Sequence, residues 1–167
     1  VSIMHVNNEV GSIQPIEEIG QFLKGKEKVF FHVDYVQGVG KVPLQIKENA
    51  IDLCTISGHK FHGMKGTGIL YVRDGIRLSA LFSGGNQERR LRSGTENVAG
   101  AVSCAKALRM SLDAMNRHKQ QMSAINEFLR DELKKIEGVI INSPDIQCAP
   151  HILNFSVPKI KSEVLVH

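Results

Sequence analysis

The chain has 167 residues, 42% hydrophobic and 23% charged, with a formal net charge of +4 and a pI near 9.0. This composition is ordinary for a globular protein, and no apolar run approaches the ~20 residues that a membrane-spanning helix needs. The densest basic run, Arg89-Arg90-Leu91-Arg92, is short and contains no aromatic residue. We therefore expect neither nucleic acid nor membrane as a partner, and a small phosphorylated molecule would explain local basic sites equally well.

Strands are predicted at 2–6, 29–34, 52–57 and 68–72 from short apolar runs bounded by turn residues. The run 29–34 is continuous, β-branched and aromatic, which is typical of a buried strand. A helix is predicted over 15–23, where apolar residues recur at helical spacing after Pro15. Strands that alternate with a helix favour an α/β fold with a mostly parallel sheet, and ligands collect at the loops where such strands end.

A long amphipathic helix is predicted from Asn97 to Gly138, with a kink between two series of apolar residues. Strands at 139–141 and 152–157 follow. We predict two units, residues 1–100 and residues 101–167. The apolar first residues, the missing initiator methionine and the apolar last residues lead us to expect a piece of a longer protein.

Asp34 ends a predicted apolar strand, where an unpaired buried carboxylate would be costly. It either faces solvent or caps the next turn, or it faces a permanent cation. The protonated ring nitrogen of pyridoxal phosphate is such a cation, and Gln37 could then reach the neighbouring phenolic oxygen.

Lys60 follows a predicted strand within the run Ser57-Gly58-His59-Lys60. A lysine amine can condense with an aldehyde to form a Schiff base, although an exposed turn lysine is the common alternative. Ser57 and His59 flank it with donors for a phosphate. Gln37 follows Asp34 by 3 residues and Lys60 follows Gln37 by 23, and this combination is more specific than any one residue.

The segment 83–97 is rich in glycine, which lets backbone amides approach a ligand or another chain closely. Ser93 or Thr95 is predicted to cap the following helix, whose first amides offer an anion site. Capping alone would explain both residues, so phosphate binding stays an alternative.

Four motifs together resemble cysteine desulfurases of the nitrogen-fixation and iron–sulfur cluster assembly type, which are class V aminotransferase-like, fold-type I pyridoxal-phosphate enzymes. The motifs are Met4-His5-Val6-Asn7-Asn8-Glu9-Val10-Gly11, His32-Val33-Asp34-x-x-Gln37, Ser57-Gly58-His59-Lys60-x-x-Gly63 with Lys65-Gly66-x-Gly68, and Arg92-Ser93-Gly94-Thr95-Glu96-Asn97. The likeness covers residues 1–157. It implies that residues 1–100 are the second half of a cofactor-binding large domain, and that residues 101–167 are a linking helix and an incomplete, smaller α+β domain.

The resemblance also implies a role for each matching residue. Lys60 would hold pyridoxal phosphate as a Schiff base and later move a proton at the substrate Cα, so it is the predicted catalytic residue. The remaining cofactor contacts would be Asp34 to the ring nitrogen, Gln37 to the phenolic oxygen, Ser57 and His59 to the phosphate, Thr95 to the phosphate in the partner subunit, and Asn8 beside the cofactor and the substrate carboxylate.

By the same resemblance, the substrate is L-cysteine, the enzyme is a cytoplasmic homodimer, and sulfur passes to an acceptor or iron–sulfur scaffold protein. The sulfur-accepting cysteine and a carboxylate-binding arginine would follow His167, whereas a ring-stacking histidine and a phosphate-binding loop would precede Val1. We therefore expect this chain alone to be inactive. A selenocysteine lyase or another class V aminotransferase, and a non-catalytic folding or interaction module, are the alternatives.

The cysteines do not supply the missing thiol. Cys54 and Cys104 are predicted to be small core residues, and Cys148 is the most exposed but does not occupy the family's position. All three are expected to be reduced because they form no C-x-x-C pair. His5 and His32 are predicted to pack at the sheet, and no histidine has a partner at metal-ligand spacing, so no metal is expected.

Overall fold

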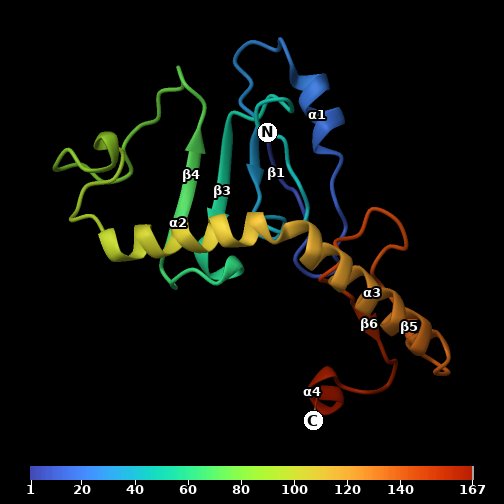
Figure 1. Ribbon diagram of the computed structural model, residues 1–167. Helices are drawn as coiled ribbons and strands as arrows, with labels where there is room; N and C mark the ends of the chain where they lie inside the picture. Colours follow the sequence, from blue (N-terminus) through green and yellow to red (C-terminus); the bar gives the residue numbers. More distant parts are fainter. Residues whose placement is uncertain (167) are drawn as a thin grey trace.

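The computed structural model describes residues 1–166 (Figure 1). A four-stranded sheet forms one end of the molecule, and a long bent helix crosses the sheet and extends away from it. In chain order the elements are β1 (Ser2–Met4), α1 (Ile16–Leu23), β2 (His32–Asp34), β3 (Leu53–Ser57), η1 (Gly58–Phe61), β4 (Gly68–Val72), η2 (Glu88–Arg90), α2 (Val98–Asp113), α3 (Met115–Lys134), β5 (Ile140–Ile141), β6 (Phe155–Ser156) and α4 (Ser162–Val166).

The main sheet has the order β1-β2-β3-β4. The first three strands are parallel, and β4 returns antiparallel to β3. The predicted mostly parallel α/β sheet is therefore confirmed. Met4 pairs with Asp34, and Asp34 pairs with Thr55. Because the three strands run the same way, the segments that follow Met4, Asp34 and Ser57 leave from the same edge of the sheet.

The prediction of a buried strand over 29–34 is wrong at its beginning. Val29 and Phe30 are exposed, and β2 begins only at His32. The backbone N–H of Phe31 donates to the Asp52 carboxylate at 2.7 Å, so a side chain takes the donor that a longer strand would use in its ladder. Phe31 itself is buried with Val33 and Cys54 in the main core.

The helices agree with the predicted pattern except at one cap. α1 is present, and α2 and α3 form the long helix with a break at Ala114, whose ψ is −1°. Neither Ser93 nor Thr95 caps α2, because Asn97 Oδ1 accepts the Gly100 N–H at 3.0 Å. Ser93 instead donates its hydroxyl to the Phe82 carbonyl at 3.0 Å, since it is too far ahead of the helix to cap it.

The end of the chain forms a small two-stranded sheet beside α3. β5 and β6 are antiparallel and shorter than the predicted strands at 139–141 and 152–157. Arg130 of α3 is buried and donates hydrogen bonds to the carbonyls of Ser143 and Pro144 and to the Asp145 carboxylate. The division at residue 100 falls within α2 and stays a prediction. No helix within residues 1–166 is both long and apolar enough to cross a membrane.

Candidate functional site

Lys60 lies on η1, a single helical turn that begins directly after β3. The side chain of Phe61, the last residue of the turn, is buried. At the other end of the turn, the Gly58 N–H donates to the Thr67 carbonyl at 2.9 Å. A side chain at Gly58 would collide with the Thr67 hydroxyl and crowd Cys104, so this close packing requires glycine. Lys60 is half-buried on the anchored turn, whereas His59 is exposed.

Asp34 ends β2 at the same edge of the sheet, and it is half-buried. Its Oδ1 accepts the Val36 N–H at 2.9 Å, which leaves Oδ2 for a second donor. The predicted turn-capping contact of Asp34 is therefore present, and a cation at its second carboxylate oxygen stays a prediction. Gln37 lies in the loop that follows Asp34 and is half-buried. The two ends of this loop are joined by a hydrogen bond of 2.6 Å from the Tyr35 hydroxyl to the Val42 carbonyl.

Asn8 lies on the turn that follows β1 and is exposed. His5 joins this segment to β2, because its N–H donates to the Asp34 carbonyl at 2.8 Å. Asn7 Oδ1 then accepts the N–H groups of Glu9 and Val10, both at 2.9 Å. This role of Asn7 was not predicted from the sequence, although an asparagine that bonds the backbone two residues on is a known turn signal.

Burial controls the protonation of the groups beneath the sheet edge. His5 packs against the Tyr35 ring at 5.2 Å, and burial lowers the pKa of His5 to about 4. Burial, and then the charge of Asp34, raises the pKa of Cys54 to about 12. Cys54 and Cys104 are both buried, which confirms that they are core residues. A thiol with so high a pKa is a poor nucleophile, so Cys54 is unsuited to carrying sulfur.

Lys41 is a site residue that the sequence analysis missed. Its Nζ donates a hydrogen bond of 2.9 Å to the carbonyl oxygen of Lys60. Burial lowers the pKa of Lys41, and the Lys60 charge lowers it further. His151 belongs to the same group: burial first, and then Lys41 and Lys60, lower the pKa of His151 to about 4. The only sequence signal is a lysine between Gly40 and Val42, seven residues after Asp34.

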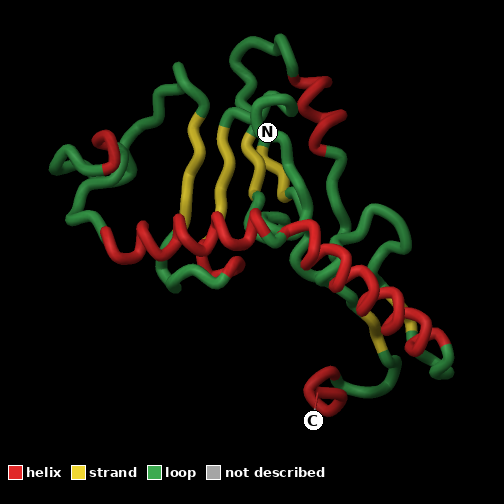
Figure 2. Tube along the Cα trace, in the orientation of Figure 1, coloured by secondary structure: helices red, strands yellow, loops and turns green. Residues whose placement is uncertain are grey.

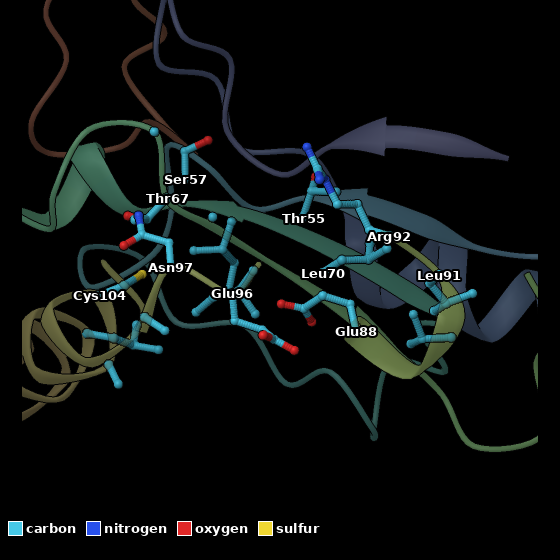
Figure 3. A pocket seen from close by; sticks show the side chains of 18 of the residues that line it. Thr55, Ser57, Thr67, Leu70, Glu88, Leu91, Arg92, Glu96, Asn97 and Cys104 are labelled. Carbon is cyan, nitrogen blue, oxygen red and sulfur yellow. The ribbon is translucent and has the colours of Figure 1, made fainter. Parts of the chain in front are cut away.

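Two cavities receive some of the predicted residues. A groove of about 1240 Å³ runs between β3, β4, α2 and the segment 88–97, and Ser57 lies at its wall (Figure 3). Thr95 also lines this groove. A smaller cavity of about 290 Å³ is lined by Lys60 and Lys41 together with residues of α3. The remaining predicted site residues line neither of these two cavities: Asn8, Asp34, Gln37 and His59.

The donors at this edge suit pyridoxal phosphate chemically. The edge offers a carboxylate with a free oxygen for a ring N–H, an amide for a phenolic oxygen, hydroxyl and imidazole donors for a phosphate, and a primary amine for an aldehyde. Within residues 1–166, no group of three or more histidine, cysteine or acidic side chains is placed to hold a metal ion.

Comparison with known proteins identifies the family of the chain. The family model for aminotransferase class V matches residues 1–167. The cysteine desulfurase IscS of Dictyoglomus turgidum is 40% identical, over 100% of this chain and 43% of that protein. The putative cysteine desulfurase IscS 1 of Bacillus subtilis is 41% identical, over 99% of this chain and 44% of that protein.

Solved structures show the same likeness. A NifS-like protein superimposes with a TM-score of 0.93 at 40% identity, over 99% of this chain and 45% of that one. A NifS-like protein from Rickettsia africae gives a TM-score of 0.92 at 35% identity, over 98% of this chain and 45% of that one. The chain thus spans less than half the length of the relatives that it matches.

Proposed function

The chain belongs to the class V aminotransferase family, and we propose that it is a segment of a pyridoxal-phosphate-dependent cysteine desulfurase. The observation that carries the proposal is the convergence of three strand-end segments. The turn with Asn8, the turn with Asp34 and Gln37, and η1 with Lys60 all leave the parallel strands at one edge of the sheet. Ligand sites of α/β sheets form at such edges.

Each residue at this edge has a defined task in the proposal. Asp34 would hold a proton on the ring nitrogen through its free oxygen, and Gln37 would donate to the phenolic oxygen. Ser57 and His59 would donate to the phosphate, and Asn8 would lie beside the substrate carboxylate. Bound pyridoxal phosphate supplies an aldehyde for exchange of amines and a protonated ring that withdraws electrons from the substrate Cα.

Lys60 would act as the base that removes a proton from the substrate Cα and returns one to the product. A primary amine suits both tasks because it accepts a proton when it is neutral and can give that proton back when it is charged. Overall, L-cysteine loses its sulfur atom to an enzyme thiol, which becomes a persulfide, and L-alanine is left. We infer that this thiol belongs to none of the three cysteines here, because Cys54 and Cys104 are buried and Cys148 does not occupy the position of the family's sulfur-accepting cysteine.

We further propose a cytoplasmic homodimer in which Thr95 contacts the phosphate in the partner subunit. Thr95 is exposed, and residues of its segment 88–97 line the groove together with β3, β4 and α2. An exposed segment beside an apolar groove is suited to contact a second subunit. An acceptor or iron–sulfur scaffold protein would then receive the persulfide sulfur.

Borohydride reduction in the presence of pyridoxal phosphate, followed by peptide mapping, tests the cofactor site. We expect one pyridoxyl adduct, on Lys60, and its loss in Lys60→Ala. Lys47 is the matched control because it is exposed, so Lys47→Ala should leave the adduct unchanged. Adducts spread evenly over surface lysines would contradict the proposal. Formation of equimolar alanine and persulfide sulfur from L-cysteine by the full-length protein would then test the reaction.

A further inference from the structure

The turn that carries Lys60 is held largely by groups from outside it. η1 has four residues, and the N–H groups of His62 and Gly63 both donate to the Gly58 carbonyl. Its later carbonyls are bonded by side chains of other elements. Lys41 Nζ donates to the Lys60 carbonyl at 2.9 Å, and Ser111 of α2 donates to the Phe61 carbonyl at a long 3.4 Å. Since the Ser111 contact is at the limit of a hydrogen bond, Lys41 provides the stronger link.

The backbone around Lys41 is itself fixed. The N–H groups of Lys41 and Val42 both donate to the Gly38 carbonyl, at 2.9 and 2.8 Å. Gly40 has a φ of +70°, and a side chain there would crowd Ser111. The flanking residues Val39 and Val42 are buried. Lys41 therefore extends from a rigid turn, continuous with the Asp34 strand, to the main chain of Lys60.

Lys41 differs from an ordinary surface lysine because its amine is partly buried and lies close to a second positive charge. Burial and the neighbouring Lys60 charge both lower the pKa of Lys41, so its placement costs free energy that the hydrogen bond to Lys60 offsets. The charges of Lys41 and Lys60 also lower the pKa of His151, after burial, and neither of its buried ring nitrogens has a hydrogen-bond partner within the described chain. Because burial keeps His151 neutral, it adds no third positive charge beside the two lysines.

We propose that Lys41 is a positioning residue, which fixes the main chain of Lys60 relative to the Asp34 strand through its hydrogen bond to the Lys60 carbonyl. The inference rests on the proposed function for its catalytic meaning, since a base must be held at a set distance from the substrate Cα. The physical link between the two residues does not depend on that function. Loss of the link would let the turn move and would misplace the amine.

Hydrogen exchange in the purified chain tests the link without any cofactor. In Lys41→Met, which keeps the length of the stem but removes the donor, we expect amides of the 58–63 peptide to exchange about tenfold faster. Lys41→Arg retains a donor and should restore at least about half of the protection. Lys47→Met is the matched control, because Lys47 lies on the same connection and is exposed. Unchanged exchange in Lys41→Met would overturn the inference, as would equal loss in Lys41→Arg.

The loaded full-length protein tests the consequence for Lys60. We expect Lys41→Met to bind pyridoxal phosphate in full stoichiometry, with a weaker visible circular dichroism band and a kcat lower by about tenfold or more at a similar KM. Unaltered dichroism and kcat in Lys41→Met would overturn the positioning role. If the parent protein itself gives no adduct on Lys60, the proposed function fails, and the exchange experiment still decides whether Lys41 holds the turn.

Discussion

Lys60 and Thr95 lie in two regions that are built differently. The strand-end region consists of residues 5–8, 34–42 and 57–63, and in it Val6, Val39 and Phe61 are at most 2% exposed. The open region consists of β4 and residues 73–97, and in it Leu70 is 51% exposed and Leu81 81%. Figure 2 shows residues 73–97 as a long loop after β4, with η2 as a short helical turn within it.

The difference shows which site residues this chain can place by itself. The strand-end region fixes Lys60 and Asp34 through its own hydrogen bonds and core. In the open region three consecutive residues, Glu88, Arg89 and Arg90, have φ of 48°, 56° and 66°. Such backbone costs roughly 1 kcal/mol or more per residue, and exposed apolar surface marks a place of contact. We infer that Thr95 acquires a defined position only against another surface.

The largest expected loss of stability comes from adding a methyl group at a glycine of the strand-end region. A side chain at Gly38 would collide with the His5 and Tyr35 rings. We expect Gly38→Ala to lower the free energy of unfolding by about 3 kcal/mol, measured by urea denaturation. Gly75→Ala is the control in the open region: nothing lies within 4 Å, but its φ of +90° should cost about 1 kcal/mol. Equal effects of the two substitutions would break the comparison.

Acid should weaken the strand-end region next. His5 has a pKa of about 4 when folded and 6.5 when unfolded, so below pH 6.5 the unfolded chain binds a proton that the folded chain does not. Stability is therefore lost as the pH falls from 6.5 to about 4, by roughly 2 to 3 kcal/mol. His151 should contribute similarly.

Replacement of single histidines separates these contributions. His5→Phe should remove about half of the loss that the two histidines cause between pH 6.5 and 4, when unfolding is followed by circular dichroism. His118→Gln is the control because His118 is exposed, and its pH dependence should match that of the parent. A His5→Phe curve parallel to the parent curve would show that burial of His5 does not set the acid limit.

The strands and helices of this fold are predictable from sequence where one periodicity dominates. α1 and the kinked α2–α3 helix follow from apolar spacing, and the mostly parallel sheet follows from the alternation of strands with a helix. The beginning of β2 cannot be predicted from apolar spacing, because the Phe31 N–H donates to the Asp52 carboxylate, which is distant in sequence. The capping residue of α2 was also predicted wrongly. Several residues that can cap a helix lie in 93–97, and only the folded geometry shows that Asn97 is the one that does so.

The candidate site is likewise only partly predictable from the sequence. Asp34, Gln37 and Lys60 are apparent because their types and spacing suit one cofactor, and their roles stay predictions. Lys41 is not apparent, since a lysine in a glycine-rich turn is usually solvated. Only the folded chain brings its Nζ to the Lys60 carbonyl, across nineteen residues of sequence. Contacts from a side chain to a distant backbone leave no periodic signal.

A moderate loss of stability is expected at the opposite edge of the sheet from Lys60, where β4 of the open region ends beside the beginning of β3. Asp52 accepts the Phe31 N–H at 2.7 Å and Arg73 Nε at 2.6 Å, so it ties the beginning of β2 to the end of β4. Asp52 is buried, whereas the Arg73 side chain is 54% exposed. We expect Asp52→Asn to lower the free energy of unfolding by about 1 to 2 kcal/mol, and Arg73→Ala by only about 0.5 kcal/mol. Asp74→Asn, at an exposed position, is the control, and a larger loss in Arg73→Ala than in Asp52→Asn would contradict the assignment.

The smallest effect on stability is expected in the open region itself. Leu81 and Phe82 are 81% and 53% exposed, so serine at either position removes little buried area and should change the free energy of unfolding by less than about 0.5 kcal/mol. The same substitutions should lower self-association and the binding of an apolar dye, because they reduce the exposed apolar patch. Val39→Ser supplies the contrast, since burial of a hydroxyl at a 1% exposed position should cost several times more. A large loss of stability in Leu81→Ser would mean that the open region is packed in solution, and the distinction drawn between Lys60 and Thr95 would fail.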